Sequence, residues 1–216
     1  MKIFFAALFD EVSPVIKKFN FREVKRLNKR QAVYQSDSVF FFITGVGWKN
    51  LEKAVSYFFL NYTVKNISVY LVGYAGAVAN NLKIGHIIKP SLIQSHNDIV
   101  RISNDNNIIL YDENRVFFKP DKIKLKKIYP DVSAVDMESY KFVSLMNKYK
   151  IENKKVIKVI SDTINTVLPD IKTLKYSLKD IFKMSLSNYV RLVKFKYNMK
   201  IASKKLSDVL SELIYE

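Results

Sequence analysis

Cysteine is absent from this 216-residue chain, and histidine occurs only twice. The lack of cysteine excludes a disulfide framework and a thiolate metal site, and His86 and His96 are too few for a histidine-rich metal centre. No apolar run approaches the roughly 20 residues that span a bilayer, and the short run after Met1 has neither the length nor the cleavage site of a signal peptide. We therefore expect a cytoplasmic protein with no metal, no cofactor and no membrane segment.

Acidic residues are few relative to basic ones: 20 Asp and Glu against 36 Lys and Arg, a formal net charge of +16. Such an excess raises nucleic acid or an anionic membrane surface as possible partners. The basic residues are, however, spread along both halves of the chain without a basic tail or block, and lysine-rich helix faces are commonly just solvated. We do not expect a membrane partner, and a nucleic-acid-binding protein is kept only as an alternative.

Short runs of β-branched and aromatic residues alternate with segments of helical periodicity. The strand-like runs are 2–8, 39–44, 67–72, 84–88, 133–135 and 156–160, and the helix-like segments are 11–19, 49–61 and 138–149. Strands that are apolar on both faces and separated by helices predict a parallel sheet covered on both sides. The expected fold is a three-layer α/β/α sandwich with a central mixed, largely parallel sheet. We expect one domain, 1–216, with 171–216 as C-terminal helices.

Glycine is scarce, and all five glycines lie between Gly45 and Gly85. Gly45 and Gly47 follow the second predicted strand, and Gly73 and Gly76 follow the third. Glycines kept at strand ends indicate positive φ or a close approach of the backbone to a ligand, although ordinary tight turns explain each motif equally well. Ligands bind at the carboxyl ends of parallel strands, so we expect the first two motifs to line one crevice.

Carboxylates follow three of the predicted strands. Asp10 and Glu11 come after the first strand, Asp136 and Glu138 after the strand 133–135, and Asp162 after the last. A carboxylate at the end of a buried strand is partly desolvated, and its raised pKa suits general acid or base chemistry. Each one alone also fits a helix N-cap or a first-turn residue. Three such sites at one edge of a sheet favour a catalytic site.

Four groups of residues, in this order, resemble the nucleoside phosphorylase family, and within it most closely the methylthioadenosine/S-adenosylhomocysteine nucleosidases. They are Met1–Ile3 with Asp10–Val12, Val72–Ala77 with Leu82–Gly85, Val135–Ser139, and Val159–Asp162. His96, Asn97 and Asp98 resemble a histidine and acid pattern of the same nucleosidases. The pairing of the sequence VDMES with ISD at this separation is the most specific part of the resemblance.

The resemblance implies an enzyme that hydrolyses the N-glycosidic bond of a purine nucleoside and releases the free base, with methylthioadenosine, S-adenosylhomocysteine or a related modified adenosine as the substrate. By similarity, Asp162 is the general acid at purine N7, and Glu11 activates the attacking water. Glu138 holds the ribose hydroxyls through charge-assisted hydrogen bonds. Further substrate contacts are expected from Met137, Gly73, Tyr74, Ala75, Gly76 and Ser161. Phe117 or Phe118 would stack on the base, with core packing as the alternative.

Two alternatives concern the reaction itself. A phosphorylase would use phosphate in place of water, but phosphorylases of this family place arginines where this chain has the acidic first turn at Asp10 and Glu11, which favours water. A non-catalytic nucleoside-binding homologue is suggested by Tyr74, which replaces a small hydroxyl residue, and by the missing base-stacking segment. Members of the family commonly form homodimers, and we expect that contact around His96 to Arg101.

Overall fold

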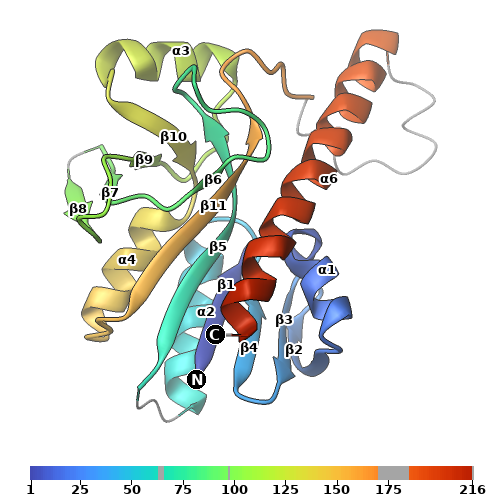
Figure 1. Cartoon of the computed structure of the whole chain (residues 1–216), viewed down its shortest axis with the longest axis vertical. Helices are drawn as coiled ribbons and strands as arrows, with labels where there is room; N and C mark the ends of the chain where they lie inside the picture. The colour runs from blue at the N-terminus through green and yellow to red at the C-terminus, as the bar shows by residue number, and fades with distance from the viewer. Residues whose placement is uncertain (63–65, 97, 170–184, 216) are drawn as a thin grey trace.

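A mixed β-sheet with helices on both faces forms the centre of the computed structural model, which describes residues 1–62, 66–96, 98–169 and 185–215 (Figure 1). The strands are β1 (Lys2–Ala6), β2 (Arg22–Asn28), β3 (Gln31–Ser36), β4 (Val39–Ile43), β5 (Ser68–Ala77), β6 (Ile87–Ile88), β7 (Leu92–Gln94), β8 (Ile99–Arg101), β9 (Ile109–Asp112), β10 (Val132–Asp136) and β11 (Lys154–Asp162). Their order in the sheet is β2-β3-β4-β1-β5-β10-β9-β7-β8, and β11 pairs with β5 and β6.

The middle of the sheet is parallel, because β1 pairs with β4 and β5, and β5 pairs with β11, in the same direction. Successive side chains of β1 point to opposite faces. The Phe4 ring stacks on those of Phe41 and Tyr70 on one face, each with a centroid distance of 4.7 Å. The next residue, Phe5, meets Phe42 at 5.1 Å on the other. This alternation explains why the apolar runs of the central strands are continuous: both faces of the sheet are buried.

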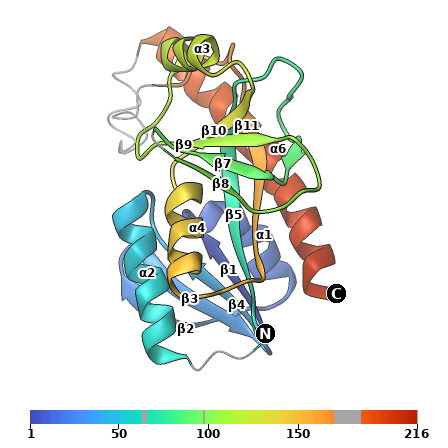
Figure 2. The ribbon, with the colours of Figure 1, turned by 90° about the vertical axis from the view of Figure 1, so that its left-hand side faces the viewer.

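The helices form two outer layers. α2 (Trp48–Asn61) and α4 (Ser139–Lys148) cover one face, and α1 (Phe9–Lys18) and α6 (Leu186–Tyr215) cover the other (Figure 2). α3 (Lys119–Ile128) packs over β9 and β10 through a third apolar cluster that includes Leu125 and Val135. The predicted three-layer α/β/α sandwich with a mixed, largely parallel sheet is confirmed.

Two predictions about the strands were wrong, and one hairpin was missed. The β2–β3 hairpin was not predicted, because six of the seven residues of β2 are exposed and carry no apolar periodicity. The predicted strand 84–88 is reduced to Ile87–Ile88, which pairs antiparallel with β11. Gly73 and Gly76 do not follow a strand, since β5 continues through both of them to Ala77.

The C-terminal helix α6 spans Leu186–Tyr215 and packs against α1 and β11. Of the C-terminal helices predicted for 171–216, the part 171–184 and residue 216 lie outside the described residues. The assignment of 1–216 to one domain stays a prediction. Within the described ranges, no helix combines the length and apolarity needed to cross a membrane.

Candidate active site

Glu11 is a buried carboxylate in the first turn of α1, with 4% of the residue exposed. Its two oxygens accept backbone hydrogen bonds from two segments: Oε2 from the N–H of Leu8 at 2.9 Å and Oε1 from the N–H of Tyr74 at 3.2 Å. Burial raises the pKa of Glu11 to about 7, although the nearby charge of Lys158 and these hydrogen bonds lower it. The side chain is therefore held in one orientation and titrates near neutral pH.

Glu138 and Asp136 meet Lys158 at the carboxyl end of β10. The Lys158 Nζ lies 2.9 Å from Asp136 Oδ2 and 3.8 Å from Glu138 Oε2, and its side chain is 2% exposed. Burial by itself lowers the pKa of this lysine, but Asp136, Glu138 and Glu11 together raise it above its usual value. Burial likewise raises the pKa of Glu138. We call Glu11, Asp136, Glu138 and Lys158 the Lys158 cluster.

Two of the glycine motifs meet at this cluster, and that they line a ligand crevice stays a prediction. The N–H of Gly47, which has a φ of +92°, donates to Glu138 Oε1 at 2.9 Å. A Cβ at Gly73 would lie 2.7 Å from Glu11 Oε1, and the φ of +149° there is one that side chains rarely adopt. Glycine at 73 thus lets strand β5 pass directly beside the buried carboxylate.

Asp112 extends the acidic region behind Asp136. Its Oδ1 accepts a hydrogen bond from the indole N–H of Trp48 at 3.1 Å, so the Trp48 side chain holds a carboxylate. Burial and, second to it, the charge of Asp136 raise the pKa of Asp112 to about 8. Ser139 fixes Asp136 in turn, with its hydroxyl donating to Oδ2 at 2.6 Å. Among the described residues, no group of three or more His, Cys, Asp or Glu side chains could hold a metal ion.

Asp162 forms a second buried site at the end of β11. It is 7% exposed, and its Oδ2 makes an ion pair with Lys122 of α3, which is 1% exposed. The hydroxyl of Ser161 donates to Asp162 Oδ1 at 3.1 Å. A Cβ at Gly76 would lie 2.5 Å from Lys122 Nζ and 3.1 Å from Asp162 Oδ2. The second glycine of β5 therefore makes room for this ion pair, as Gly73 makes room for Glu11.

The two buried sites lie along the same pair of neighbouring strands. Lys158 is paired with Gly73 in the register of β11 on β5, and Asp162 is paired with Gly76. Three residues of a strand span about 10 Å, so the ion pair lies roughly that far along β5 from Glu11. The structure thus places all three predicted carboxylates on adjoining elements, with Glu11 and Glu138 in one cluster and Asp162 paired separately.

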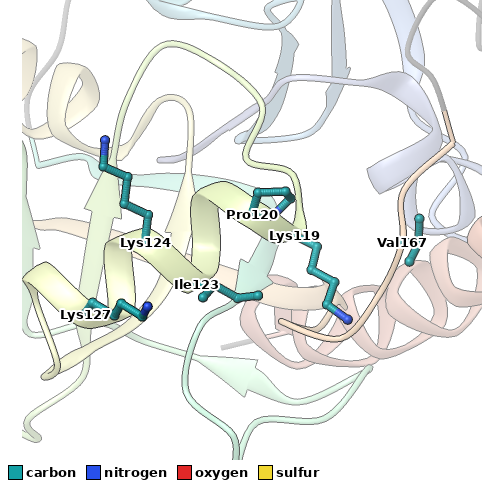
Figure 3. A pocket seen from close by; sticks show the side chains of 6 residues that line it. All are labelled: Lys119, Pro120, Ile123, Lys124, Lys127 and Val167. Atoms are coloured by element: carbon teal, nitrogen blue, oxygen red, sulfur yellow. The ribbon is translucent and has the colours of Figure 1, made fainter.

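Two hollows flank α3. The first, of about 610 Å³, is lined on the outer side of the helix by Lys119, Pro120, Ile123, Lys124 and Lys127, and by Val167 (Figure 3). The second, of about 410 Å³, has neither Lys122 nor Asp162 in its lining, which is Ala79, Asn80, Leu82, Lys83, Ile123, Thr163, Ile164 and Asn165. Small-molecule pockets are roughly 300–1,000 Å³. By volume, either hollow can take a ligand the size of a nucleobase.

The remaining predicted contacts occupy different environments. Met137 is half-buried between Asp136 and Glu138, and Ala75 is buried in β5. Tyr74 is half-buried against the α1–α6 layer, and burial followed by the charge of Glu11 raises its pKa. Its ring therefore fills apolar space beside the helices, while its backbone N–H holds Glu11.

The two phenylalanines before α3 differ in burial. Phe117 is 5% exposed and packs in the third apolar cluster, with the Arg115 guanidinium 4.5 Å from its ring centroid. Phe118 is half-buried at the start of α3. Stacking of either ring on a base stays a prediction.

The motif at 96–98 contacts the neighbouring strand and helix. The ring Nδ1 of His96 lies 3.2 Å from the Tyr111 hydroxyl, and Asp98 Oδ2 accepts a hydrogen bond from the Tyr140 hydroxyl at 2.7 Å. Asn97 lies outside the described residues.

Three buried residues of these sites were not found from the sequence: Lys158, Lys122 and Asp112. Lys158 had a usable signal, because it interrupts the apolar run 156–160 of a strand buried on both faces. A lysine there is buried, and buried lysines are paired with carboxylates. Lys122 had none, because it is one of five lysines on a polar helix: Lys119, Lys122, Lys124, Lys126 and Lys127.

The architecture described above is the α/β fold of the methylthioadenosine/S-adenosylhomocysteine nucleosidases. No protein-family model matches the chain, and no curated protein matches it at a significant level. The likeness is therefore one of structure.

Three solved structures illustrate it. A 5′-methylthioadenosine/S-adenosylhomocysteine nucleosidase from Helicobacter pylori superposes with a TM-score of 0.74 at 14% identity, covering 99% of this chain and 97% of that one. A putative nucleosidase of the same kind from Borrelia burgdorferi, bound to adenine, gives 0.71 at 19% identity, covering 100% and 99%. Futalosine hydrolase from Helicobacter pylori gives 0.73 at 14% identity, covering 99% and 97%.

Proposed function

We propose that this protein is a nucleosidase that hydrolyses the N-glycosidic bond of a purine nucleoside. The observation that carries the proposal is the meeting of Glu11 and Glu138, far apart in the sequence, around Lys158. This cluster and the Lys122–Asp162 pair lie along two adjoining strands of the fold that the nucleosidases share. The chemistry of glycosidic cleavage explains why buried charge is needed at both places.

Cleavage of the bond develops positive charge on the ribose and negative charge on the base. The Lys158 cluster suits the sugar, because three carboxylates surround one lysine and leave the region net negative when all are ionised. Glu138 is proposed to accept the ribose hydroxyls, with Met137 beside the sugar. Gly47 and Lys158 fix the Glu138 carboxylate from the protein side.

Glu11 is proposed to activate the water. A carboxylate that titrates near neutral pH can take a proton from water as that water attacks the sugar, and such general-base catalysis is worth about 10²- to 10⁴-fold in rate. The backbone N–H groups of Leu8 and Tyr74 hold the carboxylate in position for this role. The Lys122–Asp162 pair, at the other end, is proposed to act on the departing base.

Hydrolysis is favoured over phosphorolysis by the charge of the Lys158 cluster. A phosphate needs fixed cationic donors, but the lysine here is already engaged by Asp136 and Glu138. A dianion placed beside Glu11 would meet like charge. Water carries no such penalty.

The structural neighbours support a purine nucleoside as substrate, and we propose methylthioadenosine, S-adenosylhomocysteine or a related modified adenosine. One neighbour holds adenine, and another, a mutant nucleosidase, holds 5′-methylthioadenosine in its active site. Futalosine hydrolase, with the same fold, makes futalosine a further candidate. A cytoplasmic location and a homodimer belong to the same proposal.

The proposal is tested by incubating the protein with methylthioadenosine, S-adenosylhomocysteine, adenosine, inosine and futalosine, and measuring free base by chromatography. We expect release of base without phosphate, and formation of the free sugar. A requirement for phosphate, with a sugar 1-phosphate as product, would show a phosphorylase instead. Binding of a nucleoside without release of base, whether phosphate is present or absent, would show a non-catalytic binder. Tyr74, which replaces a small hydroxyl residue, is the reason for testing this outcome.

A further inference from the structure

The first half of α6 carries apolar side chains on its outward face. They are each 46–79% exposed and comprise Leu186, Tyr189, Val190, Val193 and Tyr197. Residues three or four apart share a face of a helix, so the spacing of these positions forms one line. The line lies opposite the core, because Val193 and the buried Ala202 are about two and a half turns apart at 3.6 residues per turn. We call these residues the outer stripe.

α6 packs on the rest of the protein with a different set of residues. Ala202, Leu206 and Leu210 join an apolar cluster with residues of α1 and the sheet. Of residues 186–197, all of which the structure describes, Leu192 alone is buried, and Figure 1 shows this half of α6 extending beyond α1. A surface helix normally carries polar residues on its outward face. A continuous apolar line there, with a polar border, indicates an interaction surface.

Basic side chains border the outer stripe. Residues 186–207 contain six Lys and Arg and no Asp or Glu. All six are exposed, namely Arg191, Lys194, Lys196, Lys200, Lys204 and Lys205. At about 100° of rotation per residue, Lys194 lies on one flank of the stripe and Lys196 on the other, while Lys200 and Lys204 continue its line after Tyr197. An apolar line between lysines is typical of helices that lie in the interface of an anionic membrane.

Charge distinguishes among the partners that could cover the outer stripe. A second copy of the chain would bring its own lysines against these, and each copy carries a formal net charge of +16. A nucleic acid would pair with the lysines, but its phosphates offer no contact to the apolar side chains. An anionic bilayer suits both, because acyl chains surround the apolar residues while headgroups meet the lysines. Tyr189 and Tyr197 also fit the level of the headgroups, where tyrosine is enriched.

We propose that the first half of α6 is a membrane-surface contact, and that its outer stripe inserts among the headgroups of a bilayer rich in anionic phospholipid. The helix lies along the surface, in keeping with the finding that no helix within the described ranges could cross a membrane. We did not expect a membrane partner from the sequence, because no block of basic residues dominates the charge; the helix is what arranges these lysines around an apolar line. The contact is independent of the proposed nucleosidase activity, since Glu11, Glu138 and Asp162 lie on other elements.

The electrostatic part is tested by co-sedimentation of the full chain with vesicles of phosphatidylcholine, alone or mixed equally with phosphatidylglycerol. We expect binding to the mixed vesicles only, and weaker binding as salt is added. Lys194→Gln with Lys196→Gln should weaken it by about fivefold for each lysine. The control pair Lys25→Gln with Lys29→Gln is exposed on the β2–β3 hairpin, at the opposite end of the molecule in Figure 1. It should leave binding within about twofold of wild type, because distant charges are screened.

The apolar part needs its own measurement, because a strongly basic protein can adsorb to an anionic surface by charge alone. Val190→Gln with Val193→Gln should weaken binding by about tenfold or more, while Leu60→Gln, at an exposed position of α2, should not. Tyr197→Trp should show fluorescence quenching by lipids brominated in the acyl chains. Wild type, whose single tryptophan is Trp48, gives the background and should not be quenched. All variants should unfold thermally at the wild-type temperature, because the positions are exposed.

The outcomes separate the bilayer from the other partners. Equal losses in the two lysine pairs would show adsorption by net charge, and unchanged binding in the valine variant without quenching at position 197 would show that the stripe stays outside the bilayer. Either result overturns the proposal. Binding to single-stranded DNA without binding to the mixed vesicles overturns it in favour of a nucleic acid. A dimer in ultracentrifugation that the valine variant dissociates, again without vesicle binding, overturns it in favour of a second copy.

Discussion

The two buried lysines of this protein have different surroundings. Lys158 lies among three carboxylates, with Asp136 at 2.9 Å and Glu138 at 3.8 Å, and backbone N–H groups hold Glu11 and Glu138 from outside. Lys122 pairs with Asp162, whose other oxygen accepts from a serine hydroxyl. A cation shared by several anions is largely a structural counter-charge, whereas one held by a single anion keeps donors for a ligand. The contrast suggests that the first site shapes the place for the sugar and the second acts on the base.

The largest expected effect separates the two lysines by stability. Lys158→Met leaves several buried carboxylates without their cation and should lower the free energy of unfolding by about 3–5 kcal/mol, the usual cost of breaking a buried pair. Lys122→Met leaves only Asp162 without its cation, so it should lower the free energy of unfolding by less. The further substitution Asp162→Asn should restore that stability. Urea unfolding checks both, with the exposed Lys155→Met as the control. Equal losses of stability in Lys158→Met and Lys122→Met would contradict the difference between the two lysine sites.

Glu11→Gln should lower kcat by about 10²- to 10⁴-fold, because the amide keeps the shape of the side chain but cannot take a proton from water. Its exposed neighbour Asp10 provides the matched control, and Asp10→Asn should leave kcat unchanged. Steady-state release of base measures both variants. Wild-type kcat in Glu11→Gln would mean that another group activates the water.

The two glycines of β5 allow the two sites to be compared by adding a Cβ beside each of them: Gly73 lies beside Glu11, and Gly76 lies beside the Lys122–Asp162 pair. Gly73→Ala combines a φ of +149° with a Cβ 2.7 Å from a carboxylate fixed by backbone hydrogen bonds, and should cost about 1–3 kcal/mol of stability together with most of the activity. Gly76→Ala meets the flexible end of Lys122, which can move. It should cost less stability while still lowering kcat. Thermal unfolding and kcat, measured on both variants, test this order.

The pH profile should follow the titration of Glu11. Since Glu11 is proposed to act as a base and has a pKa of about 7, kcat/KM should rise about tenfold per pH unit up to neutrality and then level off. The sign is opposite for folding: burial raises this pKa from 4.5, so its contribution to stability is complete below pH 4.5 and is lost as the pH rises through 7. The rising limb of kcat/KM should persist in the control Lys124→Met, at an exposed position of α3, and be absent from the residual activity of Glu11→Gln.

The smallest effect concerns the aromatic residues beside α3. Phe117→Leu should lower stability by about 1 kcal/mol, as expected for a conservative core substitution, and leave KM unchanged. Phe118→Leu, at a half-buried position, should barely alter stability. A rise in KM for one variant alone identifies the ring that stacks on the base.

The parts of the fold that sequence pattern revealed are those in which burial and periodicity agree. β1, β4 and β11 are apolar on both faces and were found, while β2 is almost wholly exposed and held by its hairpin partner, so it left no apolar signal. β5 was cut short because glycine was interpreted as a turn signal, although here it makes room for side chains from other elements.

The candidate site divides in the same way. Carboxylates at strand ends could be predicted because their position relative to apolar runs is visible in the sequence. The burial of Lys158 could have been inferred from its place in a two-sided strand. That of Lys122 could not, because only its ion pair with Asp162, at the end of β11, distinguishes it from its four lysine neighbours. Pairing between distant elements is a property of the folded chain and leaves no local pattern.

The placement of β5 also affects how the chain emerges from the ribosome. On one side β5 pairs with β1, which is synthesised before it. On the other side it pairs with β10 and β11, which are synthesised after it. Until residues 132–162 have been synthesised, a long apolar strand with two glycines presents unpaired backbone groups, the condition under which nascent chains aggregate. Completion of the sheet and assembly of both lysine sites must therefore coincide, so a truncated product that ends before β11 would be both inactive and prone to self-association.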